Sequence, residues 1–89
     1  MITIEITDED LHSGRHPIAS AMSRAGVRAP HASTFMVSYM GRDGAVRTTL
    51  IPPAGQQLCA NYEEGKPMQP LVIDLDIDPA DLLAPKAEA

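Results

Sequence analysis

The chain has 89 residues, a length that allows one small domain with a single hydrophobic core. Hydrophobic residues make up 44% of it, which fits a folded domain rather than a disordered segment, although aromatic residues are scarce. The formal net charge of −5 lies entirely in residues 49–89, because acidic and basic residues balance in residues 1–48. This acidic half disfavours nucleic-acid binding by the whole molecule and leaves open an acidic surface for a basic partner.

A single cysteine, Cys59, excludes an intramolecular disulfide and favours a reducing compartment. No apolar run approaches the roughly 18–20 residues that a membrane span needs. Acidic residues follow the opening Ile-rich segment at once, so we expect no signal peptide. The sequence therefore predicts an intracellular, cytoplasmic protein with no membrane association.

The first predicted elements are a strand and a short helical turn. Residues 2–7 alternate between isoleucine and polar residues, the period of a half-buried strand. Thr7 with an acidic residue three positions later is close to a capping box, and the turn that it begins should end near Gly14.

A second helix is predicted to begin at His16-Pro17, because proline suits the first helical position. Apolar residues follow at helical spacing, and Gly26 with Val27 can form a Schellman end. Residues 27–32 are predicted to be a connector that Pro30 keeps extended.

The centre of the chain predicts a β-hairpin. Residues 33–40 and 45–51 both show strand patterns, and Gly41-Arg42-Asp43-Gly44 between them is a strong turn signal. In residues 33–40, Phe35, Val37 and Tyr39 share one side. The other side carries Met36 and Met40 around Ser38, so both faces of this strand are expected to be partly covered.

The last third predicts a helix over residues 54–64, with Leu58, Cys59 and Tyr62 inward, and a strand over residues 70–77. Asp78 and Pro79 then resemble the start of a final helical turn at residues 82–83. The predicted fold class is α+β, in the order β-α-α-β-β-α-β, with helices packed on a small, mostly antiparallel sheet. Residues 1–84 should form this single domain, and residues 85–89 a flexible C-terminal tail.

Several short patterns together resemble a known group of proteins. The chain has I-x-I-T-x-x-D-L-x-x-G near its start, then P-I-A-x-A-M, then L-x-x-x-Y-x-x-G-x-P and P-L-x-I-x-L. This frame resembles small uncharacterised proteins that actinobacterial phages and their hosts encode, and it covers most of residues 2–77. In that group a cysteine precedes the proline, whereas this chain has His16, so a thiol-based role at that position is absent here. The resemblance implies a phage-encoded accessory protein inside a bacterial host.

The candidate chemistry is sparse. His12 and His16 have the spacing of a helical ligand pair, but Gly14 and Pro17 interrupt the helix that such a pair requires. We therefore predict that His16 caps the second helix and that His12 lies at the surface, with no metal and no cofactor. Cys59 with His31 or His16 is a conceivable nucleophile–base pair, but its predicted inward position favours a small core residue, and no catalytic residues are predicted.

Two groups of charged residues remain as candidate binding residues. Arg15, Arg24 and Arg28 cluster around the second helix, and Asp74 and Asp76 line the exposed face of the last strand. The acidic run does not form a calcium loop, because it lacks the glycine and glutamate that an EF-hand needs. Each group is either a solvated face or a docking surface.

These patterns favour a non-enzymatic protein that binds and modulates a host or phage macromolecule. The alternatives are a small metal- or nucleic-acid-binding module centred on His12, His16 and the nearby arginines, and a self-associating structural protein. Self-association stays open because a small α+β domain can cover a sheet face by forming a homodimer.

Overall fold

Five strands and three α-helices make up residues 1–83, the part of the chain that the computed structural model describes. Their order confirms the α+β class predicted from the sequence. The elements are β1 (Ile2–Ile6), α1 (Asp8–Leu11), α2 (Pro17–Arg24), β2 (Arg28–Ala32), β3 (Met36–Met40), β4 (Val46–Leu50), α3 (Pro53–Glu64), β5 (Leu71–Leu75) and the 3₁₀ turn η1 (Pro79–Asp81).

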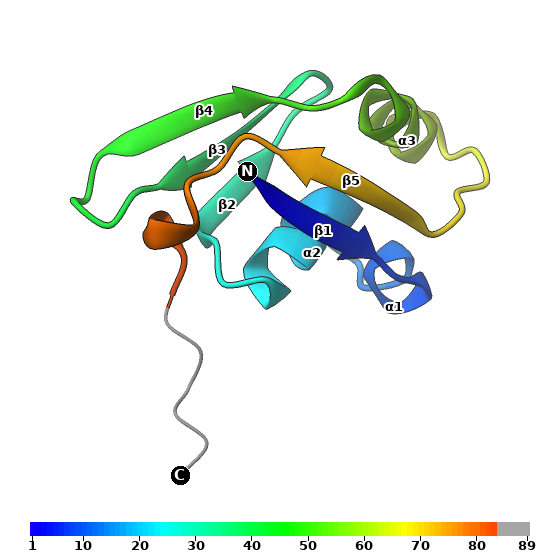
Figure 1. Ribbon diagram of the computed structural model, residues 1–89. Coiled ribbons are helices and arrows are strands. Elements are labelled where there is room, and N and C mark those ends of the chain that lie inside the picture. The colour runs from blue at the N-terminus through cyan, green and yellow to red at the C-terminus, as the bar shows by residue number, and fades with distance from the viewer. Residues whose placement is uncertain (84–89) are drawn as a thin grey trace, which may run out of the picture.

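The strands form two antiparallel sheets instead of the single sheet that was predicted. β1 pairs with β5, so the first and last strands of the domain lie side by side, and β2, β3 and β4 form the second sheet in that order (Figure 1). Helix α2 contacts both β1 and β2 and so spans the two sheets. The sheets are joined by side chains rather than by a shared backbone ladder within the described residues.

One hydrophobic core joins the inner faces of both sheets to α2 and α3. Alternation along β1, β3 and β5 directs every second residue into it, as the strand period requires. Aliphatic side chains fill it, since the chain has few aromatic residues. Its fully buried members include Ile4, Ile6, Ile18, Met22, Val37, Ile51, Cys59, Leu75 and Ile77.

The predicted start of α1 and the predicted end of α2 are confirmed, whereas α1 ends at Leu11, before Gly14. Thr7 and Asp10 form a complete capping box at the start of α1. At the end of α2, the Gly26 amide donates to the Ser23 carbonyl and the Val27 amide to the Met22 carbonyl, the two bonds of a Schellman motif. Gly26 has φ +96°, which explains why glycine stands there.

Residues 28–32 differ from the prediction, because they form a strand and not a connector. β2 pairs with β3 through Arg28, His31 and Ala32, with an irregular register between the first two. Ala29, at φ +46°, and Pro30 lie in that interval. Proline is compatible with this place because β2 is an edge strand, which has one side free of ladder hydrogen bonds.

The other strands are shorter than predicted: β3 begins at Met36 and β5 ends at Leu75. Asp78 caps η1 with Pro79 at its first position, as predicted, although the turn covers residues 79–81. The predicted tail, residues 85–89, lies outside the described residues. Within residues 1–83, none of the helices has the length and hydropathy to cross a lipid bilayer.

Candidate protein-binding surface

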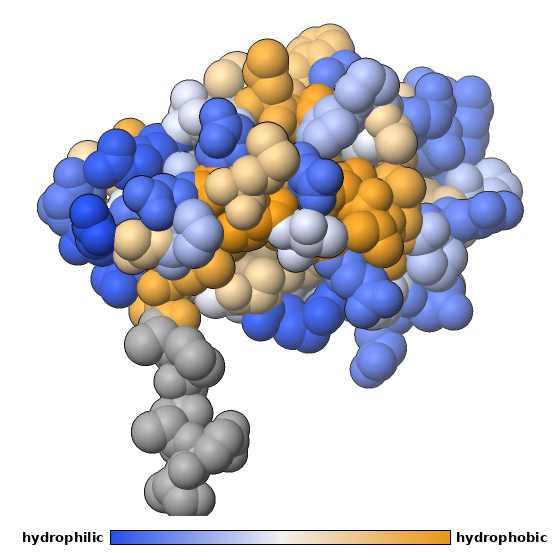
Figure 2. Space-filling view, in the orientation of Figure 1, coloured by the Kyte–Doolittle hydropathy of each residue, from blue (hydrophilic) through white to orange (hydrophobic). Residues whose placement is uncertain are grey.

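The outer face of the three-stranded sheet carries exposed apolar side chains. Val46 and Leu50 on β4 are 72% and 67% exposed, and Met36 and Met40 on β3 are each 39% exposed. We call the surface formed by Met36, Met40, Val46 and Leu50 the outer apolar face. Figure 2 shows apolar side chains protruding over the ends of β3 and β4, whereas the β3–β4 turn and the end of α3 are hydrophilic.

Strand register brings these four side chains together. Met36 is paired with Leu50, and Met40 with Val46, so two apolar pairs lie at the two ends of the β3–β4 ladder. Ser38 and Thr48 form the pair between them. Residues two apart on a strand share a face, so all six side chains point to the same side of the sheet, away from buried Val37 and Tyr39.

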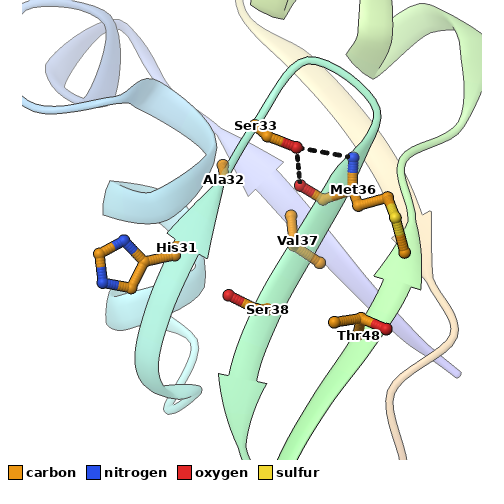
Figure 3. Close-up of a pocket in the computed structure, with 7 residues that line it drawn as sticks. All are labelled: His31, Ala32, Ser33, Met36, Val37, Ser38 and Thr48. Atoms are coloured by element: carbon orange, nitrogen blue, oxygen red, sulfur yellow. Dashed lines mark hydrogen bonds between the residues drawn. The ribbon is translucent and has the colours of Figure 1, made fainter.

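A shallow hollow of about 380 Å³ adjoins this face where β2 meets β3. It is lined by residues of both strands together with Thr48 of β4 (Figure 3). The Ser33 hydroxyl donates to the Met36 carbonyl at 3.1 Å and accepts from the Met36 amide at 3.3 Å, which ties the β2–β3 connection to the start of β3. The hollow is therefore a fixed feature of the sheet rather than of a loose loop.

The three predicted arginines occupy different surroundings. Arg15 is exposed in the connection between α1 and α2. Arg24 is held by an ion pair, with its Nη2 2.6 Å from Asp10 Oδ2 and 2.7 Å from the Glu5 carbonyl oxygen. Arg28 is half-buried in β2, and its Nε has no hydrogen-bond partner among the described residues. Of these three arginines, Arg15 is therefore the one that is exposed and makes no side-chain hydrogen bond or ion pair within the described residues.

Asp10, the partner of Arg24, is the centre of a buried polar cluster. Its carboxylate accepts hydrogen bonds from the Thr7 amide and hydroxyl, from Ser20 Oγ and from Arg24. Burial by itself raises the pKa of this carboxyl, but the hydrogen bonds from Thr7, Arg24 and Ser20 outweigh it and lower the pKa below its usual value. The cluster fastens α1 and α2 to the end of β1.

Of the predicted acidic pair, Asp74 lies on the outer side of β5 and Asp76 follows the end of that strand. Asp74 and Asp76 are exposed, and Asp74 Oδ1 accepts a 2.7 Å hydrogen bond from the Thr3 hydroxyl on β1. Both aspartates line a hollow of about 470 Å³ that also touches Leu50 and Pro52. The acidic pair therefore borders the end of β4, next to the outer apolar face.

The histidines occupy the predicted places. His16 caps α2, since its Nδ1 accepts a 3.2 Å hydrogen bond from the Ile18 amide, and its ring packs 4.9 Å from the ring of Tyr62. Burial lowers the pKa of His16, against the opposing charge of Glu63. His12 is exposed and bonds through Nδ1 to the Asp8 carbonyl. Within residues 1–83, no three side chains of His, Cys, Asp or Glu converge as a metal site.

Cys59 is fully buried in α3, as its helical position predicted. Burial, assisted by the negative charge of Glu63, raises the pKa of its thiol to about 11. The thiol therefore stays protonated at neutral pH and packs as a small apolar side chain.

Sequence reasoning did not select the outer apolar face. The strand patterns showed apolar residues on both sides of residues 36–40, which was the available signal. They could not show that α2 and α3 cover only the inner side. Phe35, predicted to lie on the same side as Val37 and Tyr39, is 60% exposed just before β3 begins.

Comparison of the chain with known proteins finds no matching family model, no matching curated protein and no matching solved structure. The resemblance to proteins of actinobacterial phages stays a prediction.

Proposed function

We propose that this chain is a non-enzymatic protein-binding domain and that its outer apolar face contacts the partner. The observation that carries the proposal is the exposure of Met36, Met40, Val46 and Leu50 on one side of one sheet. Exposed apolar pairs on one face, such as these two that flank Ser38 and Thr48, are typical of protein–protein contact sites. Methionine is well suited to such a surface, because its flexible side chain adapts to a partner's shape.

The charges around this face are mixed, because arginines lie beside Met40 and in the β3–β4 turn, and Asp74 and Asp76 lie beside the end of β4. They favour a partner with an apolar centre and both acidic and basic groups at its margin. Arg28 is paired with Met40 in the β2–β3 register, and exposed Arg42 follows β3 in the turn. Opposite charges at the rim of an interface guide association and orientation more than they add affinity.

The resemblance to phage proteins supports a bacterial setting for this function. On that basis we propose that the partner is a host or phage protein in the bacterial cytoplasm, and that binding modulates it. The metal-binding and nucleic-acid-binding alternatives rest on His12, His16 and the arginines, of which His16 and Arg24 are engaged in contacts within the domain.

A comparative pull-down from a bacterial lysate tests the proposal. The baits are the wild-type protein, M36S/M40S, which makes the β3 part of the face polar, and V72S. Val72 is a matched control, because it is an exposed apolar residue on the other sheet, 58% exposed. We expect the wild type and V72S to retain the same protein and M36S/M40S to lose it. Equal retention by all three baits, or retention by none together with a measured turnover, would overturn the proposal.

A further inference from the structure

The free edge of β4 has the features of a self-pairing strand. β4 pairs with β3 on one side, and no other strand within residues 1–83 pairs with its opposite side. Its register with β3 is continuous over all five residues, without a bulge. An open, regular edge strand is a template for pairing with another chain, and proteins usually guard such edges.

Backbone geometry shows which groups the edge offers. The Gly41 amide donates to the Ala45 carbonyl and the Ile51 amide to the Phe35 carbonyl, so Ala45 and Ile51 direct their backbone groups toward β3. These groups alternate in direction along a strand. The N–H and C=O groups of Val46, Thr48 and Leu50 therefore point away from β3 and lie at the free edge.

The other strands of the molecule are guarded differently. β2, the opposite edge of the same sheet, contains Pro30 and an irregular register. β1 and β5 carry the charged side chains of Glu5 and Asp74 on their exposed face. The one charge on β4, Arg47, points to the inner side of the sheet, where its guanidinium lies 3.0 Å from Asp43 and 3.5 Å from Asp81. Ion pairing thus compensates the only charge on β4.

We infer that β4 pairs antiparallel with β4 of a second copy of this chain, about a two-fold axis at Thr48. This inference is independent of the proposed function. With Thr48 opposite its own copy, all five residues of each strand overlap, and Val46 lies opposite the second copy's Leu50 in both halves. Such self-complementarity is what a two-fold interface requires.

Charge disfavours the neighbouring register that is centred on Arg47. Pairing Val46 with the second copy's Thr48 would shorten the overlap and set Arg47 opposite its own copy, a like-charge contact. In the Thr48-centred register, Arg47 faces Thr49 instead. The two sheets then form one continuous six-stranded sheet with two apolar rows on its outer side, each joining a Met40–Val46 pair to the second copy's Leu50–Met36 pair.

Molar mass measured by light scattering or sedimentation tests this inference. The wild type should shift with concentration from 9.5 kDa toward twice that mass, because a small interface gives a weak dimer. V46K/L50K places two ammonium groups opposite each other in both rows and should be monomeric. V46E/L50K places a carboxylate opposite an ammonium in both rows and should restore the dimer. V72K, on the exposed face of β5, should dimerise like the wild type.

Thr48→Pro is a second variant that should prevent β4–β4 pairing. It leaves the β3–β4 ladder intact, because it removes an N–H that points away from β3. We expect it to remain folded by circular dichroism and to be monomeric. A wild type that stays at 9.5 kDa up to about 1 mM, or a V46K/L50K protein that remains dimeric, would overturn the inference. Loss of the dimer without recovery in V46E/L50K would overturn the Thr48-centred register.

The dimer test and the pull-down give separable answers. M36S/M40S changes the face used in the pull-down but leaves the β4 edge, so it should still dimerise. Thr48→Pro removes the dimer but keeps all four residues of the outer apolar face.

Discussion

On the two-stranded sheet, the side chains that point away from the core include Thr3, Glu5, Val72 and Asp74. On the three-stranded sheet, the same position in the pleat is taken by Met36, Met40, Val46 and Leu50 around one serine–threonine pair. Both outer faces are exposed, and both sheets pack their inner faces into one core. The mostly polar face of the two-stranded sheet is what we expect of a surface in contact with water. The apolar face of the three-stranded sheet is not explained by packing within the domain. This difference between the two outer faces is the basis of the proposed contact with a partner.

The two halves also differ in how they are held. The β1 side depends on the hydrogen bonds that converge on Asp10 and join α1, α2 and β1. The β3–β4 turn is held from a distance, because the buried Asp81 carboxylate accepts a 3.0 Å hydrogen bond from the Arg42 amide. Polar contacts thus position both halves, and the outer side of β3 and β4 carries four exposed apolar side chains.

The largest expected effect on the free energy of unfolding tests whether the inner faces of the two sheets contribute equally to the core. Ile4 lies on β1 and Ile51 directly follows β4, and each is 1% exposed. Ile4→Ala and Ile51→Ala should each lower the free energy of unfolding by about 2–5 kcal/mol, measured by urea denaturation. Leu50→Ser, on the outer face, should change it by no more than about 0.5 kcal/mol. A loss for Leu50→Ser as large as that for Ile51→Ala would mean that the outer face is part of the core.

A smaller effect is expected where the β1 half depends on polar contacts. Asp10→Asn keeps the size of the side chain but removes the negative charge of the carboxylate. Thr7, Ser20 and Arg24 all donate hydrogen bonds to that carboxylate. We expect a loss of about 2–3 kcal/mol in the free energy of unfolding, because hydrogen bonds to a charged group contribute more than neutral ones.

Asp8→Asn is the matched control for Asp10→Asn, since Asp8 is exposed in the same helical turn. Its loss should stay below about 1 kcal/mol, the range of a surface charge near a helix N-terminus. Equal losses for the two variants would show that the buried cluster adds nothing to the helix-end effect.

The smallest expected effect is a change of the free energy of unfolding with pH. It depends on His16, the residue that caps α2 and packs against Tyr62 of α3. Burial lowers the pKa of His16 in the folded protein, so the unfolded chain binds a proton more readily. The contribution of neutral His16 to stability is therefore complete above the unfolded value of 6.5 and is lost as the pH falls through the lower folded value. Free energies of unfolding measured between about pH 7.5 and 5.5 should show this decline.

His16→Asn should reduce the decline and still cap α2, because asparagine is a good N-cap residue. His12→Asn, at an exposed position, is the control and should keep the slope of the wild type. An unchanged slope in His16→Asn would assign the decline to other groups.

Local chemistry explains which features could be predicted. The capping box at Thr7, the Pro17 start of α2 and the Gly26 end depend on contacts within a few residues, and each was found in the predicted place. The hairpin of β3 and β4 was predictable for the same reason, because a Gly-rich turn joins two alternating runs.

β2 was not predictable, because Pro30 is a signal against a strand and only the free side of an edge strand tolerates it. The role of Asp81 was hidden because its backbone partner, Arg42, lies 39 residues away. Neither fact leaves a pattern within a short window of sequence.

The sequence by itself determined the α+β class, the strand character of β1, β3, β4 and β5, and the helix caps at Thr7, His16 and Gly26, since these follow from neighbouring residues and from the side-chain chemistry of each segment. Only the tertiary structure decided that β1 pairs with β5, that the core covers one side of β3 and β4, and that β4 is an open edge. Alternation shows that a strand has two faces, but what covers each face depends on elements far away in the chain. The outer apolar face and the β4 edge therefore became candidate binding surfaces only in the folded molecule.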